Sequence, residues 1–121
     1  MNIFSEVELH HLAMNHVGKE LEKKGFEFIA INSQFKKHPQ FVCVDKPTNT
    51  LHFVMVQAVT YPDNPAEYDV LFMETFINHA MSKKAKVLYA GVGFANAEDF
   101  EKPVLKNQDY ILNYEGIKEI L

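Results

Sequence analysis

Hydrophobic positions near the start of the chain recur at helical spacing. One stripe contains Val7, Met14, Val17 and Leu21. Ser5 and Glu8 match a capping box, in which a hydroxyl and a carboxylate satisfy the free amides at a helix start. The pattern predicts a helix that begins at about residue 6 and ends at Gly25, because glycine readily takes the left-handed conformation that closes a helix.

The hydrophobic pattern then changes to that of strands. Apolar runs at residues 26–31, 40–45 and 51–59 are separated by the polar segment NSQFKKHP and by a loop at residues 46–50. That loop contains Pro47 and Asn49, residue types that are common in hairpin turns. The sequence therefore predicts three strands, of which the second and third are antiparallel neighbours.

A second helix is predicted after the third strand. Asn64 matches a helix cap, Pro65 suits the first helical position, and Glu67 completes a second capping box. The apolar positions that follow recur at helical spacing and are Val70, Leu71, Met73, Ile77, Ala80 and Met81. Residues 82–84 close this helix with polar and charged side chains.

The last third of the chain predicts two more strands, at residues 86–95 and 110–114. Asn96 is expected to cap a short helical turn, and residues 116–121 are expected to form a terminal turn. Both helices have one apolar stripe, which must be buried on a sheet. The sequence therefore predicts a mixed α/β fold in one domain, residues 1–121, with one helix packed on each side of the sheet.

Three segments carry a resemblance to a known family. ELEKKGFEFIAIN contains the helix end and the first strand, QFVCVD the second strand, and LHFVMVQAV the third. Across about residues 10–60 the chain resembles the PD-(D/E)XK, or restriction-endonuclease-like, superfamily, nearest to its small YraN-like nucleases. The resemblance implies a core with the order α-β-β-β-α-β-β. It also implies a metal site built from an acid on the first helix, an aspartate opening the second strand, and a glutamate and a lysine on the third.

The residues at those four positions cannot perform that chemistry. The resemblance matches Met14, Gln40, Met55 and Gln57 to the three acids and the lysine. Mg²⁺ requires hard oxygen ligands that include carboxylates, whereas a thioether is soft and an amide carries no charge. We therefore expect an inactive nuclease fold, a pseudoenzyme that binds no metal and no cofactor.

A relocated catalytic site is the alternative enzymatic interpretation. Asp45 and Glu74 are the acids considered for it. Strand alternation turns Asp45 away from Gln40, and Glu74 has no obvious acidic companion on its helix. A solvated helix face is the more common place for a lone glutamate.

The histidines and glycines also offer candidate sites. His10, His11 and His16 point about 100° or more apart on a helix, which favours surface or half-buried histidines over a metal site. Gly91 and Gly93 point the same way on a strand and, with Gln57, could face a small ligand. Closer helix packing or a bulge is the favoured interpretation of the two glycines.

Composition and charge narrow the compartment and the partners. The net charge of −4 is opposite to what binding a phosphate backbone requires and argues against nucleic acid. Cys43 is the only cysteine and lies in an apolar run, which suggests a buried side chain and a reducing compartment. No run approaches ~20 apolar residues, and the first residues include acids where a signal peptide has bases. We expect a cytoplasmic protein without a membrane segment.

Three functions remain open on the sequence. The favoured one is a binding or interaction module that self-associates as a homodimer, because 10 Phe and 5 Tyr provide aromatic interface material. The second is a metal-dependent nuclease with a relocated site. The third is a small-ligand-binding protein.

Overall fold

The computed structural model describes residues 2–121 as two helices and six strands. In chain order these are α1 (Glu6–Lys23), β1 (Phe26–Ile31), β2 (Phe41–Asp45), β3 (Thr50–Thr60), α2 (Val70–Ser82), β4 (Lys86–Asn96), β5 (Tyr110–Tyr114) and β6 (Lys118–Glu119). The predicted mixed α/β fold is confirmed. Among the described residues, no helix is long and apolar enough to cross a membrane.

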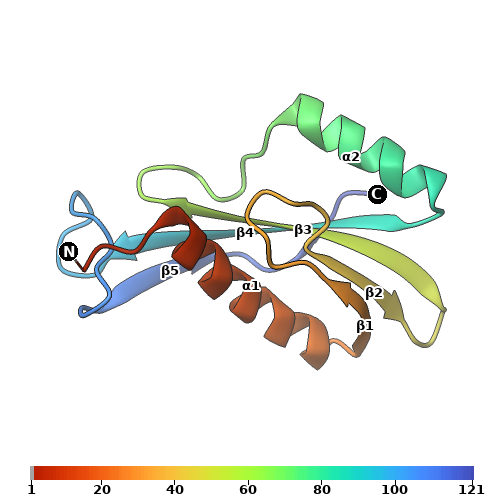
Figure 1. Cartoon of the computed structure of the whole chain (residues 1–121), viewed down its shortest axis with the longest axis horizontal. Coiled ribbons are helices and arrows are strands. Elements are labelled where there is room, and N and C mark those ends of the chain that lie inside the picture. The colour runs from red at the N-terminus through yellow and green to blue at the C-terminus, as the bar shows by residue number, and fades with distance from the viewer. Residues whose placement is uncertain (1) are drawn as a thin grey trace.

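All the strands belong to one mixed sheet (Figure 1). Its order is β1-β2-β3-β4-β5, and β6 pairs with β4 beside β5. β1, β2 and β3 form an antiparallel meander, which confirms the predicted pairing of the second and third strands. β3 and β4 are parallel, because α2 carries the chain back across the sheet between them.

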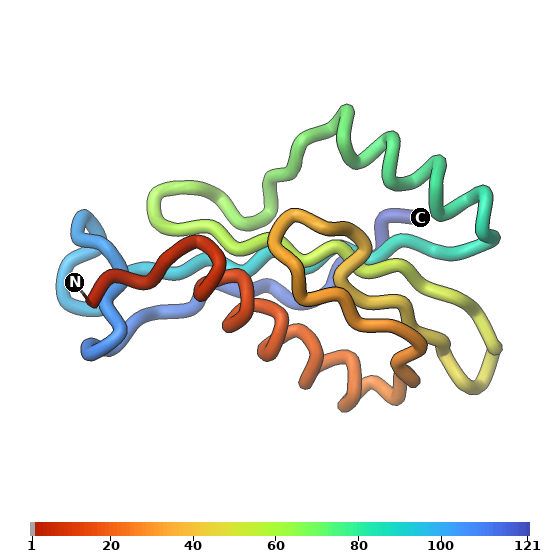
Figure 2. The backbone as a smooth tube through the Cα atoms, viewed as in Figure 1, coloured from red at the N-terminus to blue at the C-terminus, as the bar shows by residue number. Residues whose placement is uncertain are grey.

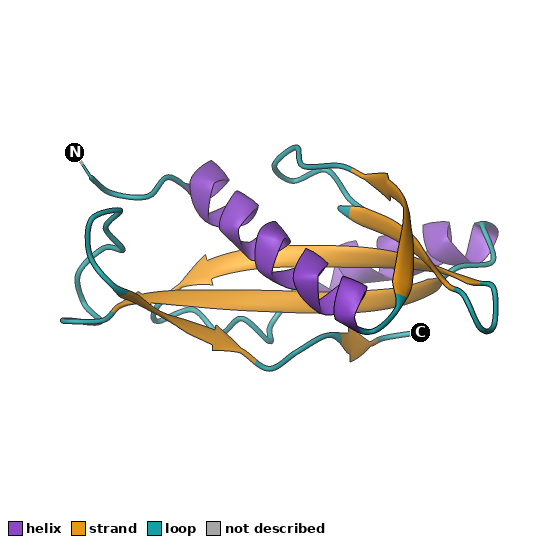
Figure 3. Cartoon of the chain, turned by 90° about the horizontal axis from the view of Figure 1, so that it is seen from below, coloured by secondary structure: helices purple, strands orange, loops and turns teal. Residues whose placement is uncertain are grey.

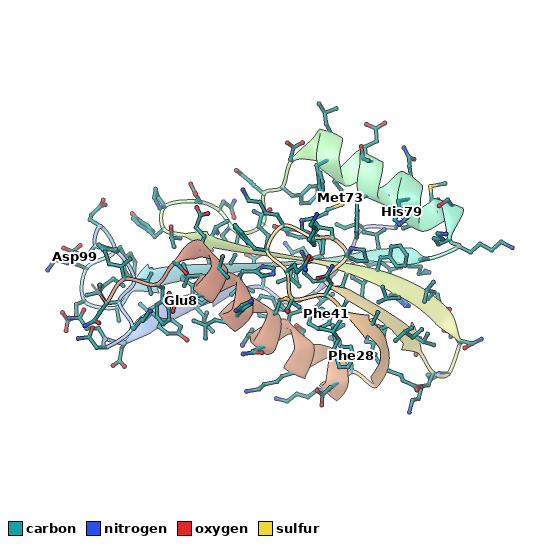
Figure 4. The ribbon with its side chains drawn as sticks, in the orientation of Figure 1. Glu8, Phe28, Phe41, Met73, His79 and Asp99 are labelled. Atoms are coloured by element: carbon teal, nitrogen blue, oxygen red, sulfur yellow. The ribbon has the colours of Figure 1, made fainter. Side chains whose placement is uncertain are left out.

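The two helices cover opposite faces of the sheet (Figure 3). Side chains of β3 alternate between the faces, so that Val54 and Val56 pack in the core under α1 while Phe53 and Met55 pack in the core under α2. Phe41 of β2 belongs to the first core and Met73 of α2 to the second; both are labelled in Figure 4. The prediction of one helix on each side is confirmed.

The start of α1 is the predicted capping box. The Ser5 hydroxyl accepts a hydrogen bond from the Glu8 amide at 3.1 Å, and the Glu8 carboxylate accepts one from the Ser5 amide at 3.0 Å. The hydrogen bond from Lys106, with those from Ser5, lowers the pKa of Glu8 to about 2. Gly25, with φ of +87°, takes the left-handed conformation expected after the last turn.

The second helix begins later than predicted. Asn64 does not cap it; its side chain accepts a hydrogen bond from the Ala66 amide in a tight turn, and Asp69 caps α2 through the Phe72 amide at 3.0 Å. The cause lies in the sheet below, because the carbonyl of Pro65 accepts a 2.6 Å hydrogen bond from Tyr89. The Glu67 carbonyl also accepts a 3.1 Å hydrogen bond from Gln57, so side chains of β3 and β4 hold residues 65–67 on the sheet before the helix begins.

Two expectations for the C-terminal third are also wrong. Residues 118–119 form strand β6, which pairs with Leu88 and Tyr89 of β4 instead of forming a terminal turn. Asn96 is buried, but it organises a loop and not a helical turn. Its side-chain oxygen accepts hydrogen bonds from the amides of Glu98 and Asp99, and its amide donates to the Pro103 carbonyl.

The missing side chain of Gly91 allows the segment between β3 and α2 to lie on the sheet. Figure 2 shows the chain turning back over the sheet in this segment. A Cβ on Gly91 would lie 1.9 Å from the Pro65 carbonyl oxygen, and one on Gly93 would lie 3.2 Å from the Pro65 ring. The two glycines therefore serve the close approach of a loop, where helix packing or a bulge was expected.

Gly91→Ala is expected to destabilise the fold by on the order of 3 kcal/mol, because the added methyl collides with backbone and not with a flexible side chain. Gly18→Ala is the matched control. Its Cβ would lie at an ordinary 3.4 Å from the Phe41 ring, and alanine within a helix should add about 0.5–1 kcal/mol. Urea unfolding of both variants measures the difference, and a Gly91→Ala protein as stable as the wild type would contradict the packing described.

Candidate functional site

The structure does not bring the four nuclease-like positions together. Met14 packs in the core under α1, whereas Met55 packs in the core under α2, so the sheet separates them. Gln40 and Gln57 both line a single groove beside β3. Only these two of the four predicted positions therefore share a surface.

Gln40 ends the pairing between β2 and β3. Its amide donates to the Val54 carbonyl at 3.0 Å, and its fully buried side chain then replaces the next backbone partner. The side-chain oxygen accepts a 2.7 Å hydrogen bond from the Val56 amide, and the side-chain nitrogen donates to the Lys37 carbonyl at 3.1 Å. Nδ1 of His38 lies 2.9 Å from that oxygen.

Beyond Gln40, and within residues 2–121, β3 pairs with a neighbouring strand on one side only. Its pairing with β2 stops at Val54, but its pairing with β4 continues to Thr60. Backbone groups of successive residues in a strand point to opposite sides. The Val56 amide points toward the β2 side and the Tyr61 amide toward β4, so the amides of Ala58 and Thr60 also point to the open side.

This open side forms a groove of about 620 Å³, which we term the β3-edge groove. It is lined by the first turns of α1 and α2, by the segment before β2, by Asp63 and by residues 56–60 of β3. In Figure 1 the segment before β2, drawn in orange, lies beside the middle of β3 between the two helices. The volume falls within the range of sites that bind small molecules or short chain segments.

One wall of the groove contains a buried imidazole without a partner. His10 of α1 is 2% exposed, and its Nε2 has no hydrogen-bond partner within residues 2–121. Its ring packs against Phe35, with 5.5 Å between the centroids. Burial lowers the pKa of His10, and the nearby imidazoles of His11 and His38 lower it further. The expectation of surface or half-buried histidines is therefore wrong for His10.

The opposite wall is formed by the start of α2. The ring of His38 lies against Phe72, with 5.2 Å between the centroids. Burial lowers the pKa of His38, against the opposite effect of its hydrogen bond with Gln40. Because the pKa of each imidazole is lowered from its ordinary value, the neutral forms of His10 and His38 are favoured at pH 7.

Charged side chains give the groove an acidic character. Glu6, Asp63 and Asp69 line it together with a single cation, Lys36. Across residues 2–121, no group of three or more His, Cys, Asp or Glu side chains is placed to hold a metal ion. Carboxylates around a groove repel phosphate and attract cationic groups.

The other sequence candidates lie elsewhere. Asp45 accepts a hydrogen bond from the Thr48 hydroxyl at the far end of β2, and Glu74 is exposed on α2. The space proposed for a ligand at Gly91 and Gly93 is occupied by the Pro65 loop. Gln57 donates to the Glu67 carbonyl at 3.1 Å and is the only one of the three ligand-facing candidates that lines the β3-edge groove.

His11 and His16 are the other two histidines of α1. Nε2 of His11 lies 3.3 Å from the Ser33 carbonyl, and the His16 ring packs on Tyr114 with 4.8 Å between centroids. Each of the three histidines therefore has its own surroundings. Sequence reasoning named His10 but missed its burial, and it missed the open edge of β3. The available signal for that edge was the length of the predicted third strand, which is greater than that of the second.

A family model described as a domain of unknown function (DUF8840) matches residues 7–120. The chain belongs to the DUF8840 family. The match spans both helices and the sheet, and therefore every element that lines the groove of this DUF8840 chain. A search of the curated proteins finds no match.

Gln40→Leu is expected to destabilise this DUF8840 chain by roughly 2–4 kcal/mol, because the Val56 amide and the Lys37 carbonyl both lose their buried partner. Gln57→Leu is the matched control. Gln57 is half-buried with one hydrogen bond, so its loss should be under about 1 kcal/mol. Equal unfolding free energies for the two variants would refute the role given to Gln40.

Proposed function

We propose that this chain is a catalytically inactive nuclease-fold protein that works as a binding module through the β3-edge groove. The observation that supports this most directly is the pair Gln40 and Gln57, two uncharged amides that line one groove at the end of β2. They are the positions that the resemblance to PD-(D/E)XK nucleases matches to an acid and a lysine. The groove offers space for a bound partner, and these two side chains lack the charges for phosphoryl transfer.

The side chains of the groove suit binding more than catalysis. Leu9, Phe35 and Phe72 provide apolar contact surface, and a few polar groups lie between them. Apolar walls with a small number of oriented polar groups are typical of binding sites. Glu6, Asp63 and Asp69 disfavour a phosphate backbone, which supports a protein partner over nucleic acid.

A cytoplasmic location is part of this proposal. The only cysteine, Cys43, is fully buried in the core under α1. Burial raises the pKa of its thiol to about 11, so it stays protonated and acts as a small apolar side chain. A fold that has no disulfide to form is suited to a reducing compartment.

Self-association as a homodimer is the second part of the proposal. On the outer side of α2, Val70 is 71% exposed, Leu71 is 76% exposed and Met81 is 57% exposed. Val70 and Met81 point the same way at about 100° per residue, with Leu71 beside them. Such a cluster on one helix can form a symmetric contact with its copy.

The purified protein is expected to show no Mg²⁺- or Mn²⁺-dependent cleavage of DNA or RNA, because no acid occupies the four matched positions. Gln57→Lys should remain inactive, since a cation alone cannot hold a metal. The assay uses labelled single- and double-stranded oligonucleotides with Mn²⁺, with and without chelator. Chelator-sensitive cleavage that elutes with the protein and is lost in Asp45→Ala or Glu74→Ala would establish a relocated site and overturn the proposal.

Light scattering at high concentration is expected to give twice the 13.9 kDa chain mass, and Leu71→Asp should give a monomer. An acidic residue in the first turn of a helix is compatible with the helix dipole, so the variant should fold. Ile29→Asp on β1 is the control, because Ile29 is 59% exposed on another element. A monomeric wild type would refute self-association, and a dimeric Leu71→Asp protein would refute the α2 interface.

A further inference from the structure

We propose that the β3-edge groove binds an extended, basic segment of a partner protein as an added strand beside residues 56–60 of β3. This inference rests on the binding function proposed above and names the class of partner. It is supported by three independent features of the groove: unpaired backbone groups, a buried imidazole without a partner, and excess negative charge.

The backbone of β3 offers a regular series of free groups. The Val56 amide is bonded to Gln40 and the Thr60 carbonyl accepts from the Asp63 amide, which leaves the Val56 carbonyl, both groups of Ala58 and the Thr60 amide. Within the described chain no hydrogen bond to these groups is found. Groups on one edge of a strand repeat about every 6.6–6.8 Å, which matches the spacing of an incoming strand. Strand addition to an open edge is an established mode of peptide recognition.

The walls fit alternating side chains. Successive side chains of an added strand would point to opposite faces of the sheet. One set would face Leu9 and His10 of α1, and the other would face Phe72 of α2. Apolar side chains can pack on Leu9 and Phe72. On the α1 side the added strand would lie beside the ring of His10, whose buried Nε2 has no partner among residues 2–121.

The negative charge of the β3-edge groove favours a basic peptide segment. Glu6, Asp63 and Asp69 outnumber Lys36 around the groove, and the neutral forms of His10 and His38 are favoured at pH 7 because burial lowers the pKa of each. Lysine or arginine at the ends of the bound segment would meet these carboxylates. A second copy of the chain is a weaker candidate, because its own net charge is −4.

Panning a phage-displayed library of random nine-residue peptides against the purified chain tests the proposal. Enriched sequences are expected to alternate apolar residues, to carry lysine or arginine, and to lack proline at the centre. A synthetic enriched peptide should bind Thr60→Pro at least about tenfold more weakly than wild type, because proline removes the Thr60 amide. Thr60→Ala keeps that amide and should stay within about twofold. No enrichment, or equal binding to Thr60→Pro and wild type, would overturn the proposal.

A second measurement does not depend on the proline variant. In ¹⁵N-labelled wild type, the same peptide should shift the amide signals of Ala58 and Thr60 and slow their hydrogen exchange. A peptide that is N-methylated at every second residue, on the edge that would face β3, should not cause these changes, because it lacks the N–H donors for pairing. Shifts confined to other elements would overturn the proposal. It would also be overturned if the signals of Ala58 and Thr60 changed with protein concentration in the absence of peptide, because a second copy of the chain would then be the occupant.

A parallel arm separates this inference from the function on which it rests. Labelled oligonucleotide with Mn²⁺ is added to the same ¹⁵N-labelled protein in place of peptide. Cleavage of the oligonucleotide would overturn the proposed inactive binding function. Absence of both cleavage and peptide binding would overturn the strand-addition proposal alone.

Discussion

The buried side-chain amide of Gln40 fixes where the paired part of the sheet ends, and the candidate site depends on that constraint. A strand cannot stop beside a longer neighbour inside a protein without leaving a backbone group unsatisfied. Gln40 solves this by accepting from Val56 and donating to Lys37 while the chain turns away. The pairing of β2 with β3 therefore ends at Val54. Residues 56–60 of β3 line a groove instead of lying between two strands.

The opposite boundary of the groove depends on a contact between distant parts of the chain. Gly91 leaves room for the carbonyl of Pro65, and Tyr89 donates a hydrogen bond to that carbonyl. The segment after β3 is thereby held flat on the sheet until Asp69 caps α2. Had the helix begun at Asn64, its first turns would have run over the end of β3, and Asp69 and Phe72 would not form a wall beside the open edge.

Features set by neighbouring residues were predictable from the sequence, whereas features set by distant contacts were not. The Ser5 capping box and the order of the elements along the chain from α1 to β5 follow from local patterns and are confirmed. The loop before α2 is held by Tyr89, 24 residues from Pro65, and β6 pairs with the edge of β4, about 30 residues before it in the chain. For the site, the resemblance identified Gln40 and Gln57 but placed Met14 and Met55 with them, and neither methionine lines the groove. It could not reveal the buried His10, because amphipathic spacing does not show which loop will cover a helix face.

Amide hydrogen exchange along β3 tests the central claim most directly, because it requires no ligand and no variant. If the edge is open beyond Gln40, the exchange rate should alternate along β3. The amides of Gln57 and Val59 point to β4 and should be protected. The Val56 amide should also be protected, because it donates to the Gln40 side chain. The amides of Ala58 and Thr60 should exchange at least about tenfold faster than that of Val59. Protection of Ala58 and Thr60 equal to that of Val59 in the free protein would contradict the account, since it would mean that the edge of β3 is already paired.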